Sequence, residues 1–263
     1  MRLIPTFLFL LLCCFTRSGK VAGQQRLRTI ENRSFKTGEK LTFRLHYGFV
    51  DAGVATLEVA PAIKKIGTRE CYHVIGTGKS VGAFDWFFKV RDRFESFVDS
   101  EAMLPWLFLR NIEEGGYKKK QRAIFNHYKD SVMSEKKTIY MPENTQDLIS
   151  AFYYARTIDF KDSKPGDIFP INGYLDDAII PLNIKFIGRE KLRTDLGTFD
   201  CIIFRPVLQE GRVFKEEEDM TVWVSDDMNR IPVRVQSNIL VGSIKMDLTG
   251  YENLLNPPAL VAK

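Results

Sequence analysis

The stretch LTFRLHYGFVDAGVATLEV, residues 41–59, decides the fold class of this sequence. Apolar and polar residues alternate strictly from Leu41 to Tyr47, which is the period-two pattern of a β-strand with one buried face. The segment 48–51 then turns the chain, and a second strand pattern runs over 53–59 until Pro61 ends it. Two strand patterns joined by a tight turn predict an antiparallel hairpin.

The same strand signal recurs along most of the 263 residues. Further strand patterns cover 71–77, 86–98, 104–110, 117–127, 132–140, 179–186, 199–206, 220–224, 232–237 and 242–251. Gly, Pro, Asn and Asp clusters separate them at short intervals, which favours an antiparallel meander or barrel over strand–helix–strand units. Because a sheet of this many strands must curl or split, we predict an all-β domain over 24–263. Its sheet is large and curved, as an open barrel or a sandwich.

One segment, near residues 145–156, breaks the strand pattern. Either Asn144 or Thr145 can cap a helix over 146–156. The helix would carry an apolar stripe, made of Leu148, Ala151, Phe152 and Ala155. We expect one central α-helix that packs against the sheet, and we expect the two halves of the chain to share that sheet.

The first 23 residues have the three parts of a cleavable signal peptide. Arg2 supplies the positive start, residues 3–15 are uncharged and mostly apolar, and Val21-Ala22-Gly23 offers a small-residue cleavage site. The apolar stretch is shorter than the roughly 17–25 residues of a spanning helix. We therefore expect a mature chain that starts at Gln24 and works in the periplasm or outside the cell.

Removing this leader changes the composition of the chain. Three basic residues leave with it, so the net charge falls from +5 to +2 and gives no electrostatic footprint for nucleic acid. Cys13 and Cys14 leave as well, and neither follows the small residue that lipid attachment needs. Cys71 and Cys201 remain; they could form a disulfide in an oxidising compartment or be two buried thiols, and the sequence leaves both interpretations open.

Motifs that would indicate catalysis or metal binding are weak. Gly76–Ser80 ends like a phosphate-binding loop, but His73 stands where that motif needs its first glycine. The acidic groups at 176–177 and 226–229 fit tight turns better than cation sites. An HExxH motif is absent from the sequence. We therefore name no catalytic residue, metal or cofactor, and we lean against an enzyme without deciding it.

The cluster Phe84, Trp86, Phe87 and Phe88 is the one candidate ligand-binding feature. Successive residues of a strand point to opposite faces, so these rings cannot all lie on one side of a strand. Either both faces are covered, or the segment lines a cavity or forms a hydrophobic rim. Burial in the core is the favoured interpretation over ligand contact. The 20 Phe residues nevertheless supply ample material for an apolar pocket inside a curved sheet.

Several stretches in a fixed order resemble a family of exported bacterial proteins, domain of unknown function 3108. They are GEKLTFRLHYGFVDAGVATLEV (38–59), QDLISAFYYARTIDF (146–160), LGTFDCIIFRP (196–206), VWVSDDMNRIPVRV (222–235) and GSIKMDLTGY (242–251). The resemblance covers roughly residues 35–255. It implies an exported β-rich protein of a Gram-negative bacterium and transfers no catalytic residue.

A shorter likeness bears on function. The segment 222–235 also resembles the hairpin of periplasmic lipoprotein carriers, in which a half-open barrel holds acyl chains beneath helices. Three hypotheses follow: a carrier of a lipid or another apolar ligand, a non-catalytic structural or interaction module of the envelope, and a hydrolase acting on envelope polymers. We expect no nucleic-acid partner. The basic run 118–122 could touch a membrane or another envelope component, although a solvated hairpin explains it more simply.

Overall fold

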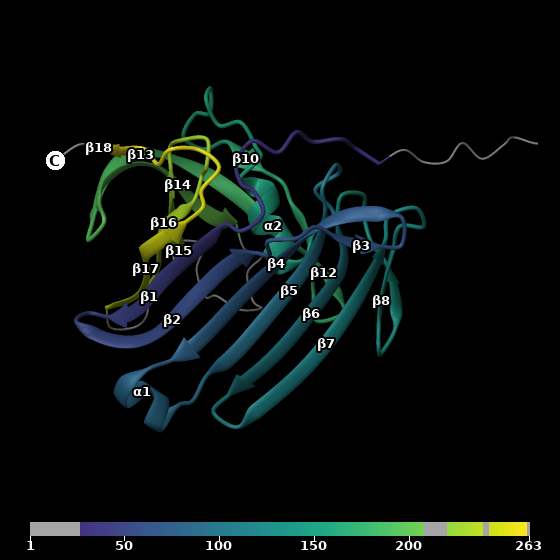
Figure 1. Cartoon of the computed structure of the whole chain (residues 1–263), viewed down its shortest axis with the longest axis horizontal. Coiled ribbons are helices and arrows are strands. Elements are labelled where there is room, and N and C mark those ends of the chain that lie inside the picture. The colour runs from purple at the N-terminus through teal and green to yellow at the C-terminus, as the bar shows by residue number, and fades with distance from the viewer. Residues whose placement is uncertain (1–26, 208–219, 239–241, 262–263) are drawn as a thin grey trace, which may run out of the picture.

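The computed structural model describes residues 27–207, 220–238 and 242–261, and a 16-stranded antiparallel sheet dominates it (Figure 1). Its order is β10 (Ile168–Phe169), β13 (Asn183–Thr194), β14 (Gly197–Val207), β15 (Met220–Ser225), β16 (Pro232–Asn238), β17 (Ser243–Glu252), β1 (Lys40–Tyr47), β2 (Val50–Val59), β4 (Arg69–Ser80), β5 (Arg91–Asp99), β6 (Pro105–Glu114), β7 (Tyr117–Asn126), β8 (Ser131–Ser134) and β9 (Thr138–Tyr140). Short strands β3 (Lys64–Ile66) and β18 (Leu260–Val261) pair with β4 and β14. A separate hairpin joins β11 (Asn172–Leu175) to β12 (Ala178–Pro181).

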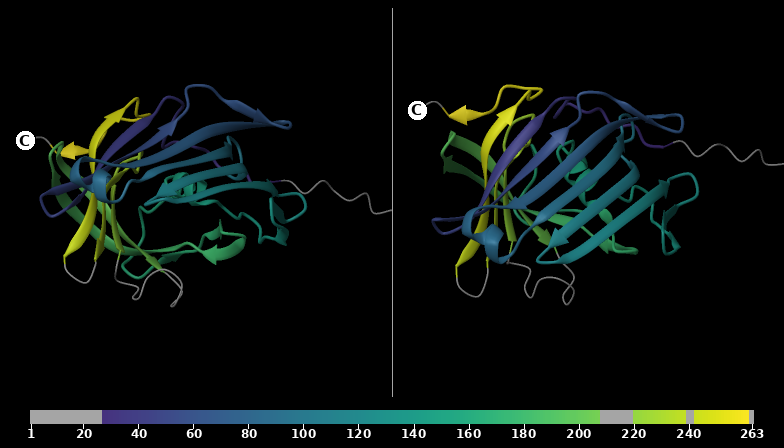
Figure 2. Two further views of the ribbon diagram at one scale, coloured as in Figure 1. Left: turned by 90° about the horizontal axis from the view of Figure 1, so that it is seen from below. Right: turned by 60° about the horizontal axis from the view of Figure 1, so that its bottom comes forward.

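The sheet curls without closing into a barrel, which confirms the predicted fold class. β10 and β9 are the two ends of the hydrogen-bonded path. Strand β1 pairs with β17 from Lys40↔Glu252 to Tyr47↔Ile244, so strands from the two ends of the chain lie side by side. The expected continuous sheet is therefore present, and Figure 2 shows the second helix, α2, inside its curl.

Helix α2 (Leu148–Ala155) is the predicted central helix, but its N-cap is Asp147 and not Asn144 or Thr145. The Asp147 carboxylate accepts hydrogen bonds from the backbone N–H groups of Ile149 and Ser150, both at 2.8 Å. The Thr145 hydroxyl donates instead to the Pro142 carbonyl at 2.6 Å. The helix starts where the carboxylate can reach its free N–H groups.

The segment 82–88 departs from the sequence prediction. It forms a short helix, α1 (Gly82–Phe87), and β5 begins only at Arg91. Asp85 stabilises this connection between β4 and β5, because its carboxylate accepts hydrogen bonds from the Ser80 hydroxyl and the Arg91 guanidinium, both at 2.6 Å. The preferred burial of the aromatic cluster was wrong: all four rings are exposed. No helix in the described ranges combines the length and apolarity needed to cross a bilayer.

Strand β14 separates two apolar cores. Adjacent residues Cys201 and Ile202 are both buried, and because strand side chains alternate they face opposite sides of the sheet. Cys201 packs with residues of β1, β16 and β17, whereas Ile202 packs with Phe160, Phe186, Phe204 and Val224. Both faces of β14 are thus covered.

The two cysteines do not form the disulfide that the sequence allowed. Cys71 on β4 and Cys201 on β14 are both buried free thiols. Burial raises the pKa of each thiol to about 12, so both stay protonated near neutral pH. The second interpretation, two buried thiols, is the one that this structure supports.

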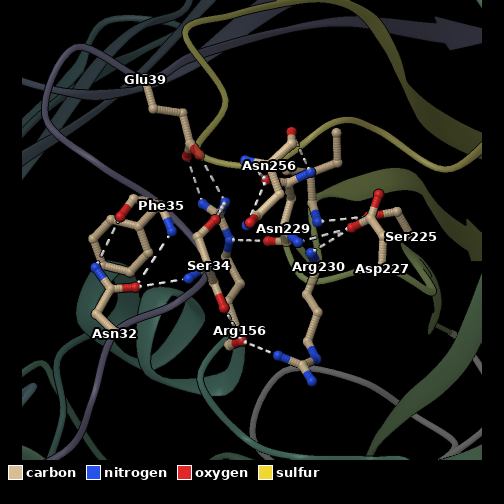
Figure 3. Close-up of polar contacts among 11 residues, drawn as sticks. Asn32, Ser34, Phe35, Glu39, Arg156, Ser225, Asp227, Asn229, Arg230 and Asn256 are labelled. Carbon is tan, nitrogen blue, oxygen red and sulfur yellow. Dashed lines mark hydrogen bonds and ion pairs between the residues drawn. The ribbon is translucent and has the colours of Figure 1, made fainter.

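A fully buried ion pair ties the end of α2 to the N-terminal segment (Figure 3). The Arg156 guanidinium donates to both carboxylate oxygens of Glu39, at 2.6 and 2.8 Å, and the two side chains are 1% and 0% exposed. The same guanidinium donates to the carbonyls of Asn229 (2.8 Å) and Ser34 (3.1 Å). Burial alone would lower the pKa of Arg156, but the Glu39 carboxylate raises it and keeps the guanidinium charged.

The turn between β15 and β16 extends this network to the C-terminal segment. The Asp227 carboxylate accepts from the backbone N–H groups of Asn229 (2.9 Å), Arg230 (3.0 Å) and Ala259 (2.9 Å). The Asn229 amide donates to the Asn256 carbonyl at 3.0 Å. Four segments that are distant in sequence therefore meet around one guanidinium.

Substituting Glu39→Gln should lower the free energy of unfolding by about 3–5 kcal/mol, because it leaves the buried Arg156 charge without its counter-ion. Urea denaturation measures the change. The matched control is Glu252→Gln, whose carboxylate is 65% exposed and lies 4.0 Å from Lys40; it should cost less than ~1 kcal/mol. Equal losses in the two variants would contradict the assigned role of the buried pair.

Burial raises the pKa of Asp147 from 3.8 to about 6, against the hydrogen bonds that favour its charged form. The stability that its protonated form contributes is present below about pH 4 and is lost as the pH rises through 6. Asp147→Asn keeps the cap but does not ionise. The difference in unfolding free energy, variant minus wild type, should therefore increase by about 2–3 kcal/mol from pH 4 to pH 7. Urea denaturation at a series of pH values measures it. Parallel pH profiles would refute this assignment.

Candidate ligand-binding cavity

A cavity of about 240 Å³ lies between α2 and the β13–β15 part of the sheet. Its walls are almost entirely apolar, and two arginines complete them. The lining residues are Leu148, Ala151, Phe152, Ala155, Arg156, Phe160, Ile171, Leu182, Ile184, Phe204, Pro206, Val222, Val224 and Arg230.

Helix α2 leaves this space open because of the residues it places there. Its apolar stripe faces the sheet as the sequence predicted, and two positions of the stripe, Ala151 and Ala155, have only a methyl group. On the β4 side the helix packs closely, because Gly76 has no side chain; an added Cβ would meet Ile149 at 3.1 Å. The helix is therefore tight against one part of the sheet and spaced from another.

The opposite wall comes from alternate residues of neighbouring strands. Phe204 and Pro206 of β14 lie beside Val222 and Val224 of β15 on one face of the sheet. Phe204 pairs directly with Val222 across the two strands. Phe160, which follows α2, packs at 4.7 Å between ring centroids on Phe204 and closes one end.

Arg230 supplies the one incompletely paired charge in the cavity wall. Its guanidinium donates to the Arg156 carbonyl at 3.1 Å and lies 3.9 Å from the carboxylate of Asp159. The Arg230 side chain is 19% exposed, whereas Asp159 is 79% exposed, so the ion pair is loose. Among the described residues, no other acceptor lies within hydrogen-bond range of this guanidinium. Burial lowers the pKa of Arg230, as expected for a cation partly removed from water.

The predicted ligand-binding cluster is not part of this cavity. Phe84, Trp86, Phe87 and Phe88 lie on or beside α1, at the end of the sheet where β1, β2, β4 and β5 turn (Figure 1). The residues lining the cavity come instead from α2, its following loop and β13–β15. The two apolar features are separate surfaces of the molecule.

The polar motifs of the sequence have structural roles. Gly76–Ser80 is the end of β4 and pairs with β2 and β5. Asp176 and Asp177 form the tight turn between β11 and β12, with φ of 51° and 61°. Across the described residues, no group of three His, Cys, Asp or Glu side chains is placed to hold a metal ion.

The three histidines are widely separated and already hydrogen-bonded. His46 contacts Asp247 at 3.1 Å, His73 contacts Glu95 at 2.7 Å, and His127 contacts the Pro105 carbonyl at 2.7 Å. The basic run is one strand of the β6–β7 hairpin, as its simpler interpretation predicted, and within it Lys118 pairs with Glu113 and Lys119 with Asp176.

Sequence reasoning identified the helix face that lines this cavity but placed no cavity there. The stripe on α2 indicated an apolar face, and the two alanines within it were a signal that the face has room. Arg230 was read only as part of the turn segment, because its approach to Arg156 depends on a contact across 74 positions. The role of Arg156 was missed for the same reason.

Comparison with known proteins agrees with this architecture. A crystal structure of a beta-barrel-like protein of domain of unknown function DUF1849 from Brucella abortus aligns over 86% of this chain and 99% of that chain, with a TM-score of 0.54 and 9% identity. This similarity shows the fold alone. A YmcC-like structure from Bacteroides fragilis (11% identity, 85% and 99% coverage) and a lipoprotein candidate from Parabacteroides distasonis (12%, 86% and 100%) have TM-scores of 0.33 and 0.31, too low to support an argument.

A search of curated proteins finds no match. A family model does match, over residues 42–249, and so spans most of the sheet together with α2 and the cavity. The chain therefore belongs to the family described as protein of unknown function DUF3108.

Proposed function

We propose that this protein binds the apolar part of a lipid or another amphiphile in the cavity between α2 and β13–β15. The observation that carries the proposal is the unfilled apolar space of about 240 Å³ under the helix. A core that served only stability would be filled by its own side chains, because protein interiors are packed nearly as densely as crystals.

The size of the cavity limits the ligand. Typical small-molecule sites have volumes of about 300–1,000 Å³, and this one is slightly smaller. One acyl chain suits it better than a two-chain lipid. Arg230 adds a preference for an anionic head, since its guanidinium lies in the cavity wall and keeps free N–H donors for a carboxylate or phosphate.

The cellular setting of the proposal comes from the leader. Residues 1–23, which lie outside the described ranges, read as a signal peptide and would place the protein in the periplasm or outside the cell. A non-catalytic interaction module of the envelope is the second candidate, and the exposed aromatic residues around α1 favour it.

Filling the cavity tests the first candidate. Ala155→Phe should reduce decanoate binding by at least about tenfold, measured by calorimetry, because the new ring occupies the space for the chain. The matched control is Ala62→Phe, an exposed position between β2 and β3, which should bind like wild type. Unchanged decanoate affinity in a folded Ala155→Phe variant would rule out this cavity as the site.

Removing the charge tests the preferred head group. Arg230→Gln should weaken decanoate binding about tenfold, the worth of one charge-assisted hydrogen bond, and should leave decanol binding unchanged. Arg193→Gln is the matched control, because Arg193 is an exposed residue of β13 and does not line the cavity. An equal loss for acid and alcohol would show that Arg230 acts only through packing.

A further inference from the structure

One end of the sheet has an unusual concentration of exposed aromatic side chains. We call these six residues the aromatic rim; with their exposed fractions they are Phe49 (101%), Phe84 (41%), Trp86 (82%), Phe87 (76%), Phe88 (52%) and Tyr117 (58%). Single exposed apolar residues are ordinary, but a group of large rings at one end of a molecule marks an interaction surface.

The rim residues lie on or beside three connections at one end of the sheet: the β1–β2 turn, the α1 segment and the β6–β7 hairpin (Figure 1). Backbone hydrogen bonds join α1 to the β1–β2 hairpin, from Val81 to Ala52 at 3.1 Å, and to the β6–β7 hairpin, from Gly115 to Lys89 at 2.9 Å. The Phe88 ring lies over Gly115, where an added Cβ would be 2.3 Å from it. The hairpin tips and α1 therefore form one supported surface.

The α1 rings cannot be covered by folding of this chain onto one face of the helix. At about 100° per residue, positions 84, 86 and 87 are spread around the helix, Phe88 follows it as the C-cap, and no residue of α1 is buried. Trp86 and Phe87 contact each other edge-to-face at 4.6 Å and project together. A surrounding apolar medium satisfies such an arrangement better than a flat protein surface does.

Lysines flank this aromatic segment. Lys79 precedes α1 and Lys89 follows it, both are exposed, and neither forms an ion pair within the described residues. Of the nearby acids, Asp51, Asp85 and Glu113 are paired with Arg44, Arg91 and Lys118. Glu114, opposite Tyr117 in the β6–β7 hairpin, forms no ion pair among the described residues, so two unpaired lysines face one unpaired carboxylate here. Lysine is depleted in protein–protein interfaces, whereas aromatic rings beside lysines are typical of surfaces that sit at the level of lipid head groups.

We propose that the aromatic rim docks on an anionic lipid bilayer, with Trp86 and Phe87 in the interfacial layer and Lys79 and Lys89 at the lipid phosphates. The proposal does not depend on the cavity or its ligand. It is compatible with a protein that takes a chain from, or delivers a chain to, a membrane.

Vesicle sedimentation tests the proposal. Exported protein, with the same N-terminus in every variant, is mixed with vesicles of phosphatidylethanolamine and phosphatidylglycerol. Wild type should sediment with them, and Trp86→Ser/Phe87→Ser should bind at least about tenfold more weakly, because burial of large apolar side chains supplies the affinity. The matched control is Tyr140→Ser, a 72% exposed ring on β9 outside the rim, which should bind like wild type.

The charge contribution has its own control. Lys79→Glu/Lys89→Glu should weaken binding to these vesicles several-fold, and Lys64→Glu/Lys65→Glu, the same charge change on β3 at the other end of the sheet (Figure 1), should not. Brominated lipids in the vesicles should quench wild-type tryptophan fluorescence, and Trp86→Phe should remove most of that quenching.

Three results would overturn the proposal: wild type that does not sediment, rim variants that sediment like wild type, or a rim that is covered by a second copy. The last would appear in light scattering as a wild-type dimer that Trp86→Ser/Phe87→Ser converts to a monomer, without vesicle binding by either. Decanoate binding to the Trp86→Ser/Phe87→Ser variant should remain unchanged, so failure of the rim and failure of the cavity are distinguishable.

Discussion

The buried ion pair between Arg156 and Glu39 is the contact on which the rest of this structure depends. Such a pair gains little over apolar side chains of the same shape, because two charges must be removed from water. Its effect is on position. The guanidinium is satisfied only when the segment before β1, the end of α2 and the β15–β16 turn are all in place. A cation at the end of α2 also interacts favourably with the helix dipole.

This constraint explains why a space persists under α2. One end of the helix is fixed by the Asp147 cap and its bond to Ser96 of β5, and the other by Arg156. Between these fixed ends, Ala151 and Ala155 are too short to reach β14 and β15. The helix cannot move onto the sheet to fill the gap without breaking a buried polar contact. The buried polar contacts that hold α2 in position therefore also keep the cavity open.

The two apolar features differ in how they are held. The cavity lies between a fixed helix and a paired sheet, so its shape is set before any ligand arrives, which lowers the cost of ordering on binding. The aromatic rim packs against the β6–β7 hairpin through Phe88 and Gly115, and its rings are otherwise exposed to solvent. The preformed pocket is the basis of the proposed ligand binding, and the exposed ring cluster is the basis of the proposed membrane docking.

The sequence by itself determined what depends on local periodicity. The alternation from Leu41 to Tyr47 and its repeats predicted the antiparallel sheet, and the stripe on 148–155 predicted the central helix. Local rules failed at 82–88, where a side chain–side chain contact from Asp85 to Arg91 makes a helix out of a strand-like run. Only the tertiary structure decided that β1 pairs with β17, that Cys71 and Cys201 remain apart, and that Arg156 meets Glu39 across 117 positions. These contacts join residues far apart in the chain, and a periodic pattern records which face of an element is buried but not what covers it.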